Sequence, residues 1–282
     1  MLASDQVMAI VEVQTTKIAA AARKRRSSRL GIVVTQIGIL AAILALWQFA
    51  VTDALLPYFS RPSMIAAKLY ELLTHRDIYR HMSVTLAEIA MGYSLGAVVG
   101  LSLGFILGRS QFLSAALQPY IIGLYSIPKI ALAPVFIVWL GLGIASKVAV
   151  VFVASFFLVF FNTYSGLISI NEELVRLARL MGASWPQTIA RVIVPAAAPQ
   201  IFLGLRTAVP YAVIGAVIGE YIGSSEGLGY FILYASQTYD AAALFAGIII
   251  LVAIVFMANF GLNWLEGCAI RWRKTGGQTV QL

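Results

Sequence analysis

The stretch "GYSLGAVVGLSLGFILG", residues 92–108, places a glycine at every fourth position among Leu, Val, Ala, Ile and Phe. In a helix surrounded by water, each glycine costs about 1 kcal/mol relative to alanine. In lipid, helices associate by close packing, and glycine lets two backbones approach each other. We therefore predict a membrane-spanning helix whose glycines form a winding groove for a crossing helix. The helix-packing positions are Gly92, Gly96, Gly100, Gly104 and Gly108.

The composition of the whole chain also favours a lipid environment. Of its 282 residues, 60% are hydrophobic and 11% are charged, whereas a soluble domain is about 45–50% apolar and about 25% charged. Such a chain has more apolar surface than one water-soluble core can bury. Cys268 is the single cysteine, so no internal disulfide is possible. His75 and His81 are the only histidines, and we predict no metal site.

Six apolar stretches reach the roughly 20 residues that cross a bilayer. We therefore predict an all-α membrane protein with six transmembrane helices. No convincing cleavage site follows the first stretch, so we expect it to remain as an anchor. We expect a short segment before the transmembrane domain (1–30), the domain itself (31–270) and a tail (271–282). The predicted spans are residues 31–51, 83–107, 113–140, 147–169, 197–222 and 241–265.

The lysines and arginines predict the orientation of these spans. With the N-terminus inside, thirteen of them lie in cytoplasmic segments and five in outer segments, the five including Lys147. Cytoplasmic loops carry the excess of positive charge, so both termini are predicted to be cytoplasmic. The net charge of +8 is then explained without a nucleic-acid partner.

The predicted outer segment 52–82 contains a short amphipathic pattern. Pro62 can begin a helix, and four apolar residues then share one face. This helix either covers the bundle or provides a docking surface for an external partner. The four residues are Ile65, Leu69, Leu72 and Leu73.

The predicted cytoplasmic loop, residues 171–195, has the pattern of two short amphipathic helices. Asn171 is a suitable cap for the first, and Gly182 is predicted to end it. Ser184 is a suitable cap for the second, and Pro195 is predicted to stop it. The pair either lies on the lipid surface or fits a groove on a soluble partner.

This loop resembles the cytoplasmic loop of permease subunits of ATP-binding-cassette (ABC) importers. That motif reads E-A-A, three residues, G, nine residues, I-x-L-P, and here Gly182, Val192 and Pro195 keep its spacing. The chain departs from the motif at its start, where Arg176-Leu177-Ala178 replaces E-A-A and Glu173 lies one turn earlier. The resemblance implies ATPase-coupling roles for Glu173, Arg176, Ala178, Gly182, Ala183, Val192 and Pro195.

The surrounding sequence, over roughly residues 55–270, is similar to permeases of the nitrate, sulfonate, taurine and bicarbonate importer group. "SIPKIALAPVFIVWLGLG" (126–143) and "EYIGSSEGLGYFILYAS" (220–236) carry much of this similarity. It implies a type I permease core of five helices, here preceded by one N-terminal span, in the bacterial inner membrane. It also implies a homodimer of permeases, two cytoplasmic P-loop ATPase subunits and an external solute-binding protein.

The chain itself lacks the phosphate-binding motif of an ATPase. The nearest approach to GxxxxGK[ST] is "GLGIASKV" (141–148), which lacks the glycine before Lys147 and the following Ser or Thr. We therefore expect a chain that is not an enzyme and carries no cofactor, with ATP and Mg bound by the partner ATPase.

Charges within spans suggest a translocation pathway. Lys129 follows Pro128 in the third span, where it either attracts an anionic substrate, pairs with a glutamate or snorkels to the membrane surface. Arg206 is expected to line an inner cavity or anchor the loop, and Glu220 to hold an outer gate; ion pairing and packing are the alternatives. The two are about four turns apart, too far to pair directly. Ser126, Asn162 and Tyr211 complete the pathway candidates.

These features together predict the membrane-spanning permease of an ATP-driven importer for a small anionic solute. The alternative is an ion-coupled secondary transporter, which needs a driving-ion site and usually an internal repeat. We see no such repeat. Only the importer hypothesis explains the two amphipathic helices of residues 171–195.

Overall fold

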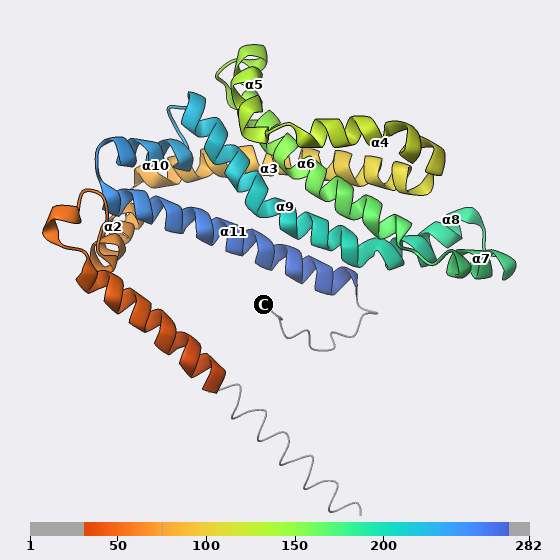
Figure 1. Cartoon of the computed structure of the whole chain (residues 1–282), viewed down its shortest axis with the longest axis horizontal. Helices are drawn as coiled ribbons and strands as arrows, with labels where there is room; N and C mark the ends of the chain where they lie inside the picture. The colour runs from red at the N-terminus through yellow and green to blue at the C-terminus, as the bar shows by residue number, and fades with distance from the viewer. Residues whose placement is uncertain (1–30, 75, 271–282) are drawn as a thin grey trace, which may run out of the picture. The chain divides into compact units, whose positions relative to one another are not determined.

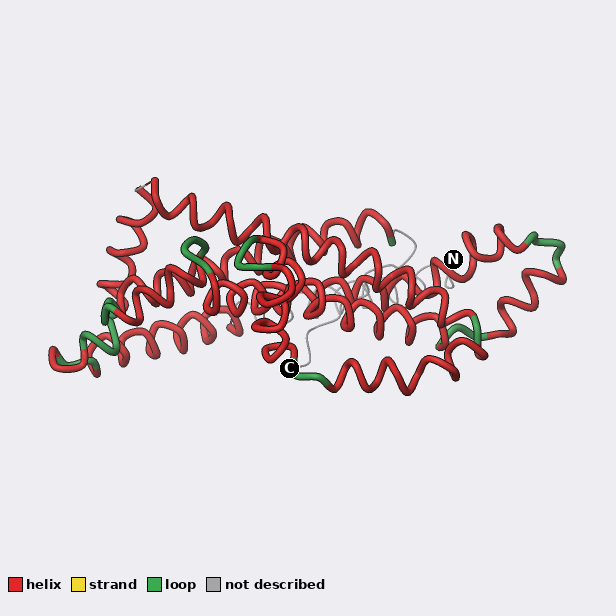
Figure 2. The backbone as a smooth tube through the Cα atoms, turned by 90° about the horizontal axis from the view of Figure 1, so that it is seen from above, coloured by secondary structure: helices red, strands yellow, loops and turns green. Residues whose placement is uncertain are grey.

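The computed structural model describes residues 31–74 and 76–270. Throughout these residues the regular structure is helical, without strands, which confirms the all-α prediction (Figure 2). The chain divides into two compact units, residues 1–64 and 65–282. The expectations for residues 1–30 and 271–282 lie outside the described residues.

The first unit contains one apolar helix, Gly31–Ala50, long enough to cross a membrane. Its last turn is tied to the chain that follows, because the Gln48 amide donates to Ser63 Oγ at 3.0 Å. The short 3₁₀ helix η1 (Asp53–Leu55) follows. Arg61 pairs with Asp53 at 2.7 Å and also donates to the Val51 carbonyl. The first predicted span is thus present as a helix.

The second unit holds the remaining candidate spans (Figure 1). Four of its helical stretches are long and apolar enough to cross a membrane, and a fifth candidate is a bent pair. In chain order the elements are α2 (Pro62–Thr74, which begins in the first unit), α3 (Arg76–Arg109), α4 (Gln111–Ser126), η2 (Lys129–Ala131), α5 (Leu132–Leu140), α6 (Ile144–Ile168), α7 (Glu172–Leu180), α8 (Trp185–Thr188), η3 (Ile189–Ile193), α9 (Val194–Gly223), α10 (Leu228–Gln237) and α11 (Ala241–Ala269).

The glycine repeat of α3 packs against α6. A Cβ at Gly92 would lie 2.5 Å from Val151 Cβ, and one at Gly104 would lie 2.8 Å from Thr163 Cβ. Gly96, Gly100 and Gly108 meet the turns of α6 at corresponding positions. Residue numbers rise together on both helices, so α3 and α6 run parallel, as two spans separated by one intervening span should. The predicted close contact is present, and its partner is α6.

A second set of small residues packs α9 against α6. Added Cβ atoms at Gly204 and Gly219 would approach Asn162 and Lys147 of α6. In return, a Cβ at Gly166 would lie 2.7 Å from Gln200 Cβ of α9. Helix α6 is therefore in close contact with both α3 and α9.

The third predicted span is not one continuous helix. Helix α4 ends at Ser126, and the segment Lys129–Leu140 continues at an angle of 75°. Ile127 and Pro128 between them have extended backbone conformations. Pro128 has no N–H to continue the helical ladder and disfavours helical geometry at the residue before it. The predicted span 113–140 is therefore present as two helical segments with a break between them.

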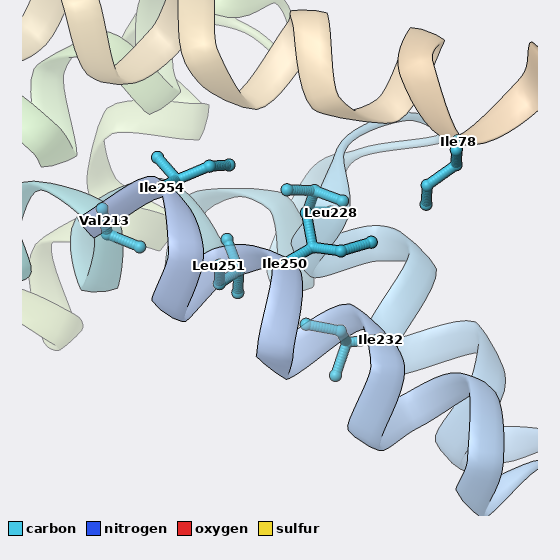
Figure 3. Packing of buried hydrophobic residues seen from close by; sticks show 7 residues of the cluster. All are labelled: Ile78, Val213, Leu228, Ile232, Ile250, Leu251 and Ile254. Carbon is cyan, nitrogen blue, oxygen red and sulfur yellow. The ribbon is translucent and has the colours of Figure 1, made fainter. Parts of the chain in front are cut away.

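The predicted outer segment does contain the helix that begins at Pro62, namely α2. Ile65 is buried, and Leu69 and Leu72 pack against a cluster formed by α3, α9, α10 and α11. Leu73 is exposed, contrary to the predicted shared face, and α3 already begins at Arg76. Figure 3 shows the side chains of this cluster gathered around α11: Ile78, Val213, Leu228, Ile232, Ile250, Leu251 and Ile254.

Candidate functional site

The loop 171–195, called the coupling loop after its predicted role, extends from one end of the second unit, opposite α10 (Figure 1). Its first helix, α7, is capped as predicted: Asn171 Oδ1 accepts from the Glu173 N–H at 2.8 Å. At the other end Gly182 has a φ of +85°, and the Ala183 N–H donates to the Ala178 carbonyl at 3.1 Å. This bond, with the one from Gly182 to Arg179, forms a Schellman cap. The helix therefore ends where the sequence predicted.

The second helix of the coupling loop differs from the prediction. Helix α8 passes through a π-helical turn, η3, directly into the long helix α9. Pro195 lies at the start of α9, directly after the π-helical turn, and does not stop the helix there. A π-turn at this place is a local adjustment of the hydrogen-bond ladder of the kind that accommodates a proline within a helical path. Val192 lies within the π-helical turn. A continuous helical path therefore joins the coupling loop to α9.

Helix α7 presents an apolar surface that the described chain leaves open. Leu174 and Leu177 are exposed, and Leu180 and Met181 are each 80% exposed. Glu173 and Arg176 are on the same short helix. An apolar surface of this kind, rimmed by charges, is typical of a protein–protein contact.

Trp185 connects the coupling loop to α3, and the sequence reading missed it. The Arg109 guanidinium at the end of α3 lies 5.1 Å from the centre of the Trp185 ring. Arg179 of α7 lies 5.4 Å from the same ring. Each contact is within the range of a cation–π interaction. The sequence places Trp185 six residues after Arg179, which was the available signal. It did not indicate that Arg109, far earlier in the chain, lies beside the same ring.

Replacing Trp185 with leucine is expected to loosen the coupling loop. Each cation–π contact contributes about 0.5–1 kcal/mol at an exposed site, so amide hydrogen exchange within 172–188 should quicken by about tenfold. Trp139→Leu is the matched control, because Trp139 is exposed on α5 and touches neither arginine. Equal exchange in the two variants would show that Trp185 does not hold the loop.

A cavity of about 280 Å³ lies where α4 and α5 break, against α6 and α9. Two of the predicted pathway residues, Lys129 and Tyr211, line it together. Tyr125 also contributes, and Lys129 Nζ lies 3.9 Å from the centre of its ring. The other predicted pathway residues are not among those that line this cavity.

Three of those residues make other contacts. Ser126 Oγ and Asn162 Nδ2 donate to carbonyls of their own helices, at Ile122 and Leu158. Arg206 pairs with Glu266 of α11 at 3.1 Å and also donates to Asn263 at 2.6 Å. The ion-pairing alternative for Arg206 is thus present, and Arg206 and Glu220 do not pair with each other.

Glu220 holds the turn that follows α9. Its side chain is fully buried and accepts from Thr85 Oγ1 of α3 at 2.6 Å and from the Gly229 N–H of α10. Thr85 Oγ1 in turn accepts from the Leu228 N–H at 2.7 Å. One buried carboxylate therefore joins α3, α9 and the glycine-rich segment 223–229.

Next to Glu220 lies a buried ion pair that the sequence reading missed. Lys147 Nζ lies 3.6 Å from Glu88 Oε1 and donates to Ser224 Oγ at 2.9 Å. Lys147 was counted among the outer segments, as the first residue of the predicted span 147–169. It lies in the first turn of α6, and only 7% of its surface is exposed. Glu88, an acidic residue inside an apolar span, was the available signal. The counter-charge in the low-dielectric interior allows Lys147 to be buried.

Glu220→Ala is expected to lower the stability of the folded chain. The substitution leaves the buried Gly229 N–H without its acceptor, at about 1–3 kcal/mol for the unsatisfied group. The Thr85 hydroxyl keeps only its longer bond to the His81 carbonyl, at 3.2 Å. Glu220→Gln keeps one carbonyl acceptor and should melt closer to the unmodified protein. Thermal unfolding in detergent measures both. If Glu220→Ala unfolded at the same midpoint temperature as the unmodified chain, this network would not hold the turn.

The described residues thus form a helical bundle with a broken span, a buried polar network beside the turn after α9 and two short helices in the loop 171–195. The comparisons with known proteins assign this bundle to the permeases of ABC importers. The chain belongs to the family described as binding-protein-dependent transport system inner membrane component, which residues 96–267 match. It is therefore a multi-pass protein of the inner membrane.

Similar proteins support this assignment. The SsuC protein of Bacillus subtilis (strain 168), by name a putative aliphatic sulfonates transport permease, is 33% identical over 83% of this chain and 86% of its own length. The formylaminopyrimidine transport permease protein ThiX of Halalkalibacterium halodurans is 36% identical over 82% of this chain and 93% of its own length. The chain is accordingly similar to importers of the sulfonate type.

The fold has a counterpart among solved structures. A chain of the MetNI methionine ABC transporter, in an inward facing conformation, superposes with a TM-score of 0.60 at 22% identity. The match covers 68% of this chain and 95% of that one. The arrangement of helices is thus that of a known importer permease.

Proposed function

We propose that this chain and a second copy of it form the translocation pathway for a small anionic solute. An external binding protein delivers the solute, and two cytoplasmic ATPase subunits, which bind ATP and Mg, drive its transport. The proposed ATPase contact is the coupling loop, residues 171–195. ATP hydrolysis takes place on the ATPase subunits, so the permease itself is not catalytic.

The observation that carries this proposal is the exposed apolar surface of α7. Its side chains, Leu177, Leu180 and Met181 among them, have no cover in the described chain. The helix is nevertheless well built, with a side-chain cap at Asn171 and a Schellman cap at Gly182. An ordered amphipathic helix with an open apolar side fits a groove on a partner. The continuous path from α8 into α9 gives a means of transmitting movement of that partner to a membrane span.

Two observations support an anionic solute. Lys129 lines the cavity beside the α4–α5 break, and no ion pair joins it to a carboxylate among the described residues. The name of SsuC assigns that relative to aliphatic sulfonates, which are anions. A cation without a carboxylate partner at a break in a span is well placed to attract a negative charge.

The test is a pull-down of the tagged chain from native membranes in mild detergent, with mass spectrometry of the proteins that accompany it. We expect a P-loop ATPase in stoichiometric amount, together with a solute-binding protein. The Leu180→Glu/Met181→Glu double variant should lose the ATPase and keep its place in the membrane. A chain that purifies alone in several detergents would contradict the proposal.

A further inference from the structure

The cavity beside the α4–α5 break has mostly apolar walls. It has a volume of about 280 Å³ and is lined mostly by aliphatic and aromatic carbons, including Phe157, Ile214 and Ile218. An engineered apolar cavity of about 150 Å³ takes one benzene molecule. The space beside Lys129 is therefore large enough for a single aromatic ring with substituents.

Lys129 brings one positive charge to these walls. Its Nζ donates to the Tyr125 carbonyl at 2.9 Å. That carbonyl belongs to the last turn of α4, which loses its helical partner where the helix breaks at Pro128. The lysine thus caps α4 and is held in position by the break itself. An ammonium group has three N–H donors, and this bond uses one.

Two aromatic rings lie beside the ammonium group. Its nitrogen lies 3.9 Å from the centre of the Tyr125 ring and 5.6 Å from that of Phe157. These two rings meet edge to face, with their centres 5.5 Å apart. A flat ring is favoured against such surfaces, because offset and edge-to-face arrangements are the preferred contacts of aromatic groups.

We propose that this cavity binds a single-ring aromatic monoanion, a carboxylate or a sulfonate, with its charge on Lys129 and its ring against Tyr125 and Phe157. This inference rests on the proposed function and names the substrate class of its pathway. A bare inorganic anion would leave the apolar walls unfilled. A neutral ring would leave the ammonium group without a counter-charge, and a dianion would meet only one cation.

The test uses the full chain in lipid nanodiscs and two probes, 4-fluorobenzoate and its neutral analogue 4-fluorobenzamide. Fluorine NMR line broadening, corrected with empty nanodiscs, measures binding of each. We expect the benzoate to bind about tenfold or more tightly than the benzamide, because the charge-assisted hydrogen bond is present only for the anion. Equal binding of the two probes would overturn the proposal, as would displacement of the benzoate by an equal concentration of nitrate.

Variants test the two halves of the site separately. Lys129→Met keeps the apolar stem and should weaken benzoate binding to the level of the benzamide, whereas Lys129→Arg should retain the preference for the anion. Ala154→Leu fills the cavity and should weaken both probes. Ala145→Leu, the same change at an exposed position of α6 outside the lining, should weaken neither. Benzoate binding that Lys129→Met and Ala154→Leu leave intact would place the probe elsewhere and contradict the proposal.

The outcomes separate this inference from the function on which it rests. Loss of the ATPase from the pull-down would contradict the importer function and leave the probe measurement unaffected. Failure of the benzoate to bind, with the ATPase and binding protein present in the pull-down, would contradict only the substrate class.

Discussion

Gly182→Pro is expected to abolish coupling to the ATPase while leaving the permease in the membrane. Gly182 has a φ of +85°, whereas proline holds φ near about −65°. The substitution also removes the N–H that donates to the Arg179 carbonyl at 3.0 Å. Strain and the lost hydrogen bond together cost about 3 kcal/mol. Co-purified ATPase per permease should therefore fall by about tenfold or more, and solute uptake by cells should be lost.

Gly141→Pro is the matched control for this change. Gly141 has a φ of +80°, and its N–H donates to the Ile137 carbonyl at 2.8 Å, so the strain and the lost bond are similar. Gly141 precedes α6, whereas the coupling loop follows it. The control should therefore retain the ATPase. If Gly182→Pro kept both the ATPase and wild-type uptake, residues 171–195 would not be the coupling loop.

Gly100→Leu is expected to lower the stability of the folded chain. A Cβ at Gly100 would lie 2.9 Å from the Phe156 carbonyl oxygen and 3.1 Å from the Phe160 nitrogen. Both are backbone atoms of α6, so no side chain can move aside to make room. Overpacking of this kind costs about 1–3 kcal/mol and occasionally more. Thermal unfolding in detergent should therefore show a midpoint lower by about 2–12 °C.

Gly123→Leu provides the comparison for the packing test. Gly123 lies within α4, and no atom comes within 4 Å of a Cβ added there. The Gly123→Leu variant should unfold at a midpoint temperature close to that of the unmodified protein. The midpoint of Gly100→Ala should lie between those of the two leucine variants. Equal unfolding midpoints for Gly100→Leu and Gly123→Leu would mean that the glycine repeat of α3 does not hold this helix against α6.

The local features of the coupling loop were predictable, because each depends on residues a few positions apart. Asn171 caps α7 through an N–H two residues away, and Gly182 ends it through bonds to residues three to five positions earlier. Pro195 was misread. Its place in the first turn of α9 depends on the π-helical turn of residues 189–193, for which the sequence carried no clear signal.

The spans followed from composition, and their glycines predicted close packing. The sequence did not predict which helix packs against the glycines of α3, because an apolar groove accepts any helix of suitable shape. Only the tertiary structure shows that α6 fills it. Pro128 accounts for the break of the third span, yet the angle of 75° between its two segments depends on the packing around it.

The sequence by itself determined the membrane class, the number of apolar spans, the glycine stripe and both ends of α7, because lipid solvation and helix capping act over short distances along the chain. Only the tertiary structure decided which charges meet. It brings Glu88 of α3 to Lys147 of α6, and Thr85 to Glu220 of α9, from positions 59 to 135 residues apart. A buried charge requires a partner, but the sequence does not say which one, because that choice depends on how the helices pack.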